Sequence, residues 1–106
     1  MLLSEKDYKK IETIIIDSID GNSEDGGSEI EYIKGNETLY IDCSWAVLMK
    51  QVELTRDEYN RVEYGSEIVS VTLDVKEFTC FNEDGDLTSC NLDSYKLKNN
   101  VEVAYR

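Results

Sequence analysis

The chain has 106 residues, of which 23 are acidic, 11 are basic and none is histidine, so its formal net charge at pH 7 is −12. This excess of negative charge would repel nucleic-acid phosphates and anionic membranes, and neither is expected as a partner. A basic protein surface would be attracted instead. Without histidine the usual base for a serine or cysteine nucleophile is missing, so we expect no enzymatic activity and no catalytic residue.

The length predicts a single domain covering residues 1–106 around one modest core. Cys43, Cys80 and Cys90 lack C-x-x-C spacing, and the first residues do not resemble a signal peptide, so we expect independent thiols in a reduced cytoplasmic protein. Three dispersed cysteines predict no zinc site, and no sequence motif predicts a cofactor. An EF-hand-like spacing from Asp20 to Glu31 lacks the glycine of the sixth loop position, so no metal site is expected.

The first predicted element is a helix over residues 4–19. Ser4 is a good N-cap, and Asp7 follows three residues later in a capping-box arrangement. An apolar stripe with helical spacing follows, made of Tyr8, Ile11, Ile15 and Ile19. Residues 21–28 are rich in glycine, serine and acid, which predicts a flexible acidic linker before the next element.

After the linker the apolar period changes to two, which predicts strands. A two-residue turn at Gly35-Asn36 would pair Tyr32 with Leu39 and Ile30 with Ile41 on one buried face. Cys43 and Trp45 continue that face, and Trp45 is expected to anchor the core. Residues 44–54 fit both helical and alternating patterns, and we favour a long strand with a bulge near Lys50.

Residues 56–64 are predicted as a short second helix. The run from Thr55 to Glu58 has capping-box spacing, and Gly65 could end the helix. Tyr59 and Tyr64 lie in this charged connecting segment, where tyrosine is often interfacial, so both are candidates for partner binding.

Residues 67–81 give the clearest strand, with an apolar phase that flips at Lys76-Glu77 and so predicts a bulge there. Asp84-Gly85 predicts a turn, residues 87–91 a returning strand and residues 101–105 a last strand. The expected fold class is therefore α+β, with an N-terminal helix packed on an antiparallel sheet of about five strands. The helix stripe should pack on Ile30, Tyr32, Leu39, Ile41, Val69, Val71 and Leu73.

Two stretches contain acids and no base, namely residues 17–31 and residues 77–93. Solvated turns would explain both stretches, and so would an acidic patch that binds a partner. The acidic candidates for partner binding are Glu24, Asp25, Glu29, Glu31, Glu83, Asp84 and Asp86.

The capped helix, the acidic glycine-rich link, the Glu-Ile-Glu-Tyr-Ile-Lys-Gly-Asn hairpin and the Glu-Asp-Gly-Asp turn resemble small acidic α+β proteins of bacteriophages and of mobile elements of gut bacteria. This resemblance implies no activity. We expect a small acidic protein that binds a basic protein surface, such as a DNA-mimicking anti-defence inhibitor or a toxin-immunity protein. The alternative is a structural or assembly module, which could form homo-oligomers through its sheet edge and exposed tyrosines.

Overall fold

The computed structural model describes residues 1–19 and 25–105. It contains two helices, α1 (Glu5–Ser18) and α2 (Ser94–Val103), and four strands: β1 (Asp25–Lys34), β2 (Glu37–Arg56), β3 (Val62–Phe81) and β4 (Leu87–Thr88). The strands form one antiparallel sheet in the order β1-β2-β3-β4. The α+β class is therefore confirmed, although the sheet has four strands where about five were expected.

The predicted first helix is confirmed, and its N-cap explains where it begins. The Asp7 backbone N–H donates to the Ser4 hydroxyl, and the Asp7 carboxylate accepts from the Ser4 backbone N–H at 2.7 Å. This reciprocal box satisfies backbone donors that the first helical turn would otherwise leave without partners. The first half of the predicted linker, residues 21–24, lies outside the described residues, and the prediction is wrong for residues 25–28, which are the start of β1.

The predicted β1–β2 hairpin is confirmed in its register. Tyr32 lies opposite Leu39 and Ile30 opposite Ile41, and all four side chains are buried. Gly35 supplies the positive φ of 61° that the tight turn requires.

β2 and β3 are twenty residues each and pair along nearly their whole length. Residues 44–54 are strand, as expected. The irregularity nearest to Lys50 lies on the partner strand, because Leu48 faces Ser70 and Met49 faces Ile68, which leaves Val69 of β3 as the bulged residue. The second expected bulge is also present, because Asp42 faces Glu77 while Cys43 faces Val75.

The prediction of a helix at residues 56–64 is wrong, because this segment is the loop that joins β2 to β3 and the start of β3. The Asp57 carboxylate accepts from the backbone N–H groups of Tyr59 and Arg61, at 2.9 and 2.8 Å. Asn60 takes a φ of 61°, which reverses the chain. The acid that resembled part of a helix cap therefore stabilises a hairpin loop.

The prediction of a last strand at residues 101–105 is also wrong, because residues 94–103 form α2. Asp93 caps this helix by accepting from the Lys96 backbone N–H at 3.1 Å. Leu97 and Val101, four residues apart, are fully buried on one face of the helix. The returning strand after the Asp84-Gly85 turn is shorter than expected, since β4 is only Leu87–Thr88.

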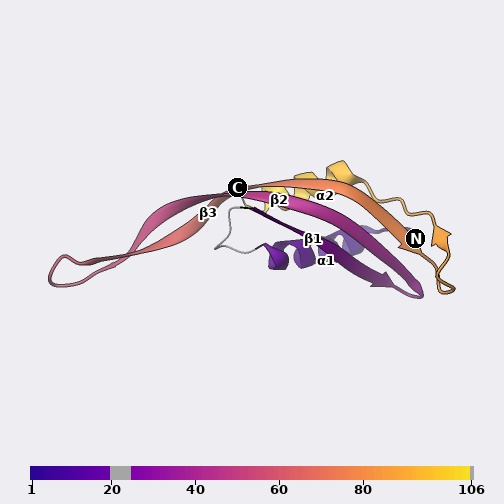
Figure 1. Cartoon of the computed structure of the whole chain (residues 1–106), viewed down its shortest axis with the longest axis horizontal. Coiled ribbons are helices and arrows are strands. Elements are labelled where there is room, and N and C mark those ends of the chain that lie inside the picture. Colours follow the sequence, from indigo (N-terminus) through magenta and orange to yellow (C-terminus); the bar gives the residue numbers. More distant parts are fainter. Residues whose placement is uncertain (20–24, 106) are drawn as a thin grey trace.

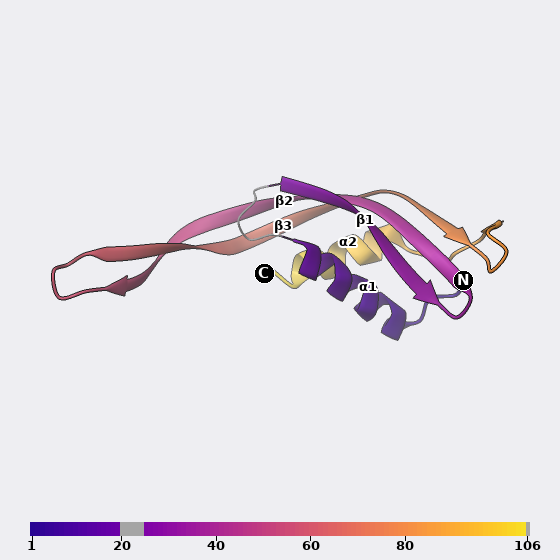
Figure 2. The ribbon, with the colours of Figure 1, turned by 60° about the horizontal axis from the view of Figure 1, so that its bottom comes forward.

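Both helices cover the same face of the sheet, as Figure 2 shows. Their apolar sides and the inner sides of the strands form one core, which contains every predicted core residue except Val69. Val69 is 45 % exposed, because it is the unpaired residue of a bulge in β3, where Ile68 packs against the core instead. Trp45 is buried, as predicted. The helices also contact each other, since the Lys96 amino group lies 4.4 Å from the centre of the Tyr8 ring.

The molecule is long and thin, with extents of 65 × 22 × 22 Å. β1 begins at Asp25, opposite Ala46, and beyond this point β2 and β3 continue as a pair that projects away from the helices (Figure 1). We call residues 48–70 the hairpin arm and the rest of the molecule the body. Every residue of the arm is exposed or half-buried, and the arm contacts the buried core only near its base, where Met49 and Ile68 pack against it.

Candidate functional site

The face of the sheet opposite the helices carries a group of acidic side chains. Side chains alternate between the two faces of a strand, so the acids next to buried residues point away from the core. These residues, which we call the acidic face, are Asp25, Glu29, Glu31, Asp42, Asp74 and Glu77.

The centre of the acidic face is a row of three acids across three neighbouring strands. Glu29 on β1 lies opposite Asp42 on β2, and Asp42 lies opposite Glu77 on β3. Directly opposed side chains in an antiparallel sheet have Cβ atoms about 4.5–5.5 Å apart, and like charges in such positions are destabilising. This row therefore lowers the stability of the isolated protein at neutral pH.

Few basic groups lie near this row. Lys34 on β1 donates to the Asp7 carboxylate at 2.7 Å, and so it is directed towards the N-terminus of α1. Lys76 is exposed in the β3 bulge, beside Glu77. Within residues 1–19 and 25–105, no ion pair involves a member of the acidic face.

The structure brings together three of the acids that sequence patterns selected. Asp25, Glu29 and Glu31 share the outer side of β1, while Glu24 lies outside the described residues. The sequence interpretation missed the contributions of β2 and β3, which are Asp42, Asp74 and Glu77. Alternation alone could have placed each of them on an outer face. The β1–β2 register then puts Asp42 opposite Glu29, and the β2–β3 register adds Glu77 to that row and places Asp74 opposite Ser44.

The other predicted acids, Glu83, Asp84 and Asp86, lie in the turn between β3 and β4. The Asn82 side-chain oxygen accepts from the backbone N–H groups of Asp84 and Asp86, at 3.0 and 2.9 Å, and thereby orders the turn. Asn36 donates to Glu83 at 3.2 Å, so this turn lies beside the β1–β2 turn. These acids are therefore at one end of the molecule and do not belong to the central row.

The two predicted tyrosines lie on the hairpin arm, at the opposite end of the molecule (Figure 1). Tyr59 is 70 % exposed at the tip, where the Arg61 guanidinium lies 5.3 Å from the centre of its ring. Tyr64 is 57 % exposed and faces Glu53 on β2. Both residues are accessible to a partner, but they are separate from the acidic face.

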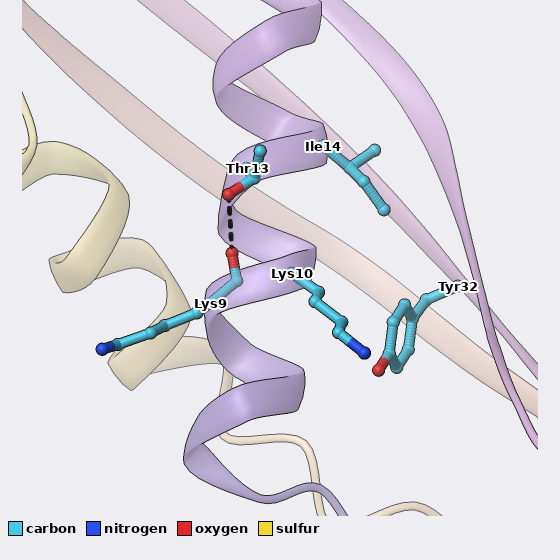
Figure 3. A pocket seen from close by; sticks show the side chains of 5 residues that line it. All are labelled: Lys9, Lys10, Thr13, Ile14 and Tyr32. Atoms are coloured by element: carbon cyan, nitrogen blue, oxygen red, sulfur yellow. Dashed lines mark hydrogen bonds between the residues drawn. The ribbon is translucent and has the colours of Figure 1, made fainter.

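A shallow groove of about 430 Å³ lies between α1 and β1 and is lined by Lys9, Lys10, Thr13, Ile14 and Tyr32. Figure 3 shows Lys10 directed towards Tyr32 and Lys9 directed away from it. The Tyr32 hydroxyl donates to Asp7 at 2.5 Å, and the Thr13 hydroxyl donates to the Lys9 carbonyl at 2.9 Å. Both hydroxyls are therefore engaged, and the lining contains no carboxylate or thiol.

The buried titratable groups are held in unreactive forms. Burial raises the pKa of Cys43 to about 11, and it also raises the pKa of Cys80, so both thiols stay protonated at neutral pH. The Lys34 amino group and the Ser4 backbone N–H hold the pKa of Asp7 well below its usual range. Burial and the neighbouring Asp7 carboxylate raise the pKa of Tyr32 to about 12.

In the part of the chain that the structure describes, no group of three or more acidic or cysteine side chains could hold a metal ion. None of the described helices is long and apolar enough to cross a membrane. No protein-family model matches the chain, and searches of curated proteins and of solved structures find no match either.

Proposed function

We propose that the protein is a small, non-enzymatic binding protein whose acidic face contacts a basic protein surface. The observation that supports this proposal is the uncovered row of Glu29, Asp42 and Glu77. Lysine and arginine side chains of a partner would neutralise three opposed carboxylates at once. Binding would then recover stability that the row costs the free protein.

The acidic face is better suited to covering a basic site on a partner than to inserting a segment into that site. Three paired strands present their carboxylates from a continuous backbone ladder, which is a firm platform that a partner can meet without reordering it. Complementary charge also steers the encounter and raises the association rate at low salt. We therefore propose an inhibitor that covers a basic site, either as a DNA mimic in anti-defence or as an immunity protein against a basic toxin.

The cellular location of the protein is also part of the proposal. Cys43, Cys80 and Cys90 are free thiols in the structure, which supports a cytoplasmic location. The resemblance to proteins of bacteriophages and mobile elements stays a prediction.

The proposal is tested by removing three negative charges either from the acidic face or, as a control, from the hairpin arm. The face variant combines Glu29→Gln, Asp42→Asn and Glu77→Gln, and the control on the arm combines Glu58→Gln, Glu63→Gln and Glu67→Gln. Both variants have the same net charge. With an oligolysine peptide as the probe, calorimetric titration should show binding at least about tenfold weaker for the face variant, and a change of less than about threefold for the control.

Stability gives the same experiment a second readout. The face variant should unfold at a higher denaturant concentration, by about 0.2–1 kcal/mol for each opposed pair that is relieved. Equal weakening of oligolysine binding by both variants would contradict the proposal, because net charge alone would then account for the attraction.

The second candidate function is an assembly module, and the exposed hairpin arm favours it. An arm that carries accessible tyrosines and contains no buried residue has the character of a contact element rather than of a core strand. Binding through apolar side chains would strengthen or stay unchanged as salt rises, whereas binding through the acidic face would weaken.

A further inference from the structure

Of the described strands only β2 pairs with β1, so β1 forms one edge of the sheet. The pairing runs through all ten residues from Asp25 to Lys34 without a bulge. Residues of an antiparallel pair alternate between hydrogen-bonded and non-hydrogen-bonded positions. The two-residue turn makes Lys34 and Glu37 a hydrogen-bonded pair, so the even-numbered residues of β1 bond to β2. The odd-numbered residues therefore direct their backbone groups to the free edge.

The backbone donors along this edge are unused by the rest of the described chain. Within residues 1–19 and 25–105, no odd-numbered N–H group of β1 donates to another residue. On β3, by contrast, the Leu73 backbone N–H donates to Glu102 of α2 at 2.9 Å. Proteins commonly protect an exposed edge with proline, lysine or a bulge, but the chain has no proline and the one lysine of β1 is its last residue, Lys34. The edge of β1 is therefore regular enough to accept another strand.

The groove between α1 and β1 lies beside this edge, on the inner side of the sheet. α2 contacts the other side of α1, where Asn100 donates to Glu12 at 2.7 Å. Figure 3 shows Ile14 and Lys10 on the side of α1 that faces β1, with Tyr32 across from them. Successive side chains of a strand point to opposite faces of the sheet. Every second side chain of a strand added to β1 would therefore point into this groove of about 430 Å³.

We propose that the edge of β1 binds an extended segment of a partner protein, as an added antiparallel strand in which basic and apolar residues alternate. The basic side chains would lie opposite Glu29 and Glu31, and the apolar side chains would enter the groove beside Ile14 and Tyr32. In strand addition, backbone hydrogen bonds give affinity and alternate side chains give specificity. The inference deepens the proposed function, because its choice of basic residues rests on the acidic face.

Charge selects such a segment over a second copy of the chain. The charged side chains on the outer side of β1 are all acids, namely Asp25, Glu29 and Glu31. A second β1 strand would bring these acids against their own counterparts, and like charges in opposed positions are destabilising. Lysine or arginine in the same positions would form stabilising pairs of opposite charge. The acids thus oppose self-association at an edge that is open to a basic strand.

The first experiment uses the acetylated and amidated peptide Val-Lys-Val-Lys-Val-Lys-Val, methylated on backbone nitrogen in two ways. In the proposed pairing the lysine N–H groups face β1 and the valine N–H groups face away. One form is methylated on its lysines and the other on an equal number of valines, so charge and composition match. Calorimetric titration of the unmodified protein should show binding at least about tenfold weaker for the lysine-methylated form.

Three results of this titration would overturn the proposal. They are equal affinity of the two forms, tighter binding of the lysine-methylated form, and no binding of either form up to about 1 mM. The groove is tested with a valine-methylated peptide in which serine replaces the unmethylated valine and alanine replaces the others. This peptide keeps the charge but loses the apolar side chains, and it should bind at least about tenfold more weakly. Unchanged affinity would overturn the role of the groove.

Matched variants of β1 localise the peptide. Glu31→Pro removes a backbone N–H that faces the free edge, and proline is compatible with an edge strand at such a position. Glu31→Gln removes the same charge and keeps the N–H. The valine-methylated peptide should bind Glu31→Pro at least about tenfold more weakly than Glu31→Gln. Fluorescence of the buried Trp45 checks that both variants are folded, and equal binding would overturn the assignment to this edge.

Oligolysine separates failure of this inference from failure of the proposed function. It should bind Glu31→Pro and Glu31→Gln within about threefold of each other, because both variants carry the same charge. If oligolysine binding depends on the acidic face while the two methylated peptides bind equally, strand addition is wrong and the proposed function stands. If the valine-methylated peptide binds selectively while oligolysine shows no preference for the acidic face, the proposed function is wrong and the edge of β1 still binds a strand.

Discussion

Removing the side chain of Ile15 tests whether α1 is docked on the sheet as described. Ile15 lies on the inner side of α1 and is 0 % exposed, in the same core as Ile11, Leu39 and Leu73. Ile15→Ala deletes three carbon atoms from a position that the surrounding strands cannot easily refill. Such truncations of buried isoleucine or leucine cost about 2–5 kcal/mol, which is a large part of the 5–15 kcal/mol that stabilises a typical domain.

The assay is chemical denaturation followed by Trp45 fluorescence and by circular dichroism, which should report one coincident transition. Ile33→Ala is the matched control, because Ile33 is 61 % exposed on the outer side of β1. The control should lose less than about 1 kcal/mol, mainly through the lower strand propensity of alanine. If the midpoint of Ile15→Ala matched that of the control, the helix would not be packed on the sheet and the fold would need revision.

Three further predictions follow from individual contacts. Replacing Asp7 by Asn should lower stability by about 1.5–3 kcal/mol at pH 7, because its carboxylate accepts from Ser4, Tyr32 and Lys34. Since the pKa of Asp7 is depressed in the folded protein, its stabilising effect is present above about pH 4 and is lost as pH falls. Thermal melts of the variant should therefore be less sensitive to acid than melts of the parent. Identical dependence of the two melting temperatures on pH would contradict this. Gly26→Ala should destabilise the folded protein by about 1–3 kcal/mol and shift the Trp45 fluorescence, because a Cβ at this position would lie 2.7 Å from Trp45 Nε1. An unchanged melting temperature and an unchanged spectrum would argue against that contact. Native protein should react quickly with a thiol reagent at Cys90 alone, because Cys43 and Cys80 are buried, and rapid reaction of all three would show that the core is open.

The elements that the sequence predicted well are those fixed by local chemistry. The Ser4–Asp7 capping box and the Gly35 turn specify their own geometry, and the turn then sets the register of β1 on β2. The flip of the apolar phase at Lys76-Glu77 likewise marks a bulge that the structure contains. In each case the signal and the structure it determines lie within a few residues of each other.

The wrong predictions arose where one short pattern fits two structures. Spacing from Thr55 to Glu58 resembles a helix cap, yet Asp57 uses its carboxylate to close a hairpin loop. Val101 and Val103 alternate like strand residues, but the Asp93 cap and the contacts of α2 with the core select a helix. Tertiary packing decided between the alternatives, and local pattern could not.

The acidic face was predicted only in part for a similar reason. Asp25, Glu29 and Glu31 are close in sequence, and alternation places them on one side of a single strand. Asp42 lies opposite Glu29 through the β1–β2 register, whereas the place of Glu77 in the row depends on the pairing of β2 with β3 and on the bulge beside it. The register between strands that are distant in sequence therefore adds residues to the proposed binding surface that residue spacing alone does not reveal.

The most direct test of the central claim is to map where a basic probe binds on the unmodified protein. Oligolysine should be titrated into isotopically labelled protein at low salt while backbone amide resonances are followed by NMR. We expect the largest shifts to cluster around Glu29, Asp42 and Glu77 on β1, β2 and β3, and to diminish as salt is added. Shifts confined to the hairpin arm or to residues 82–86, with the central row unaffected, would contradict it.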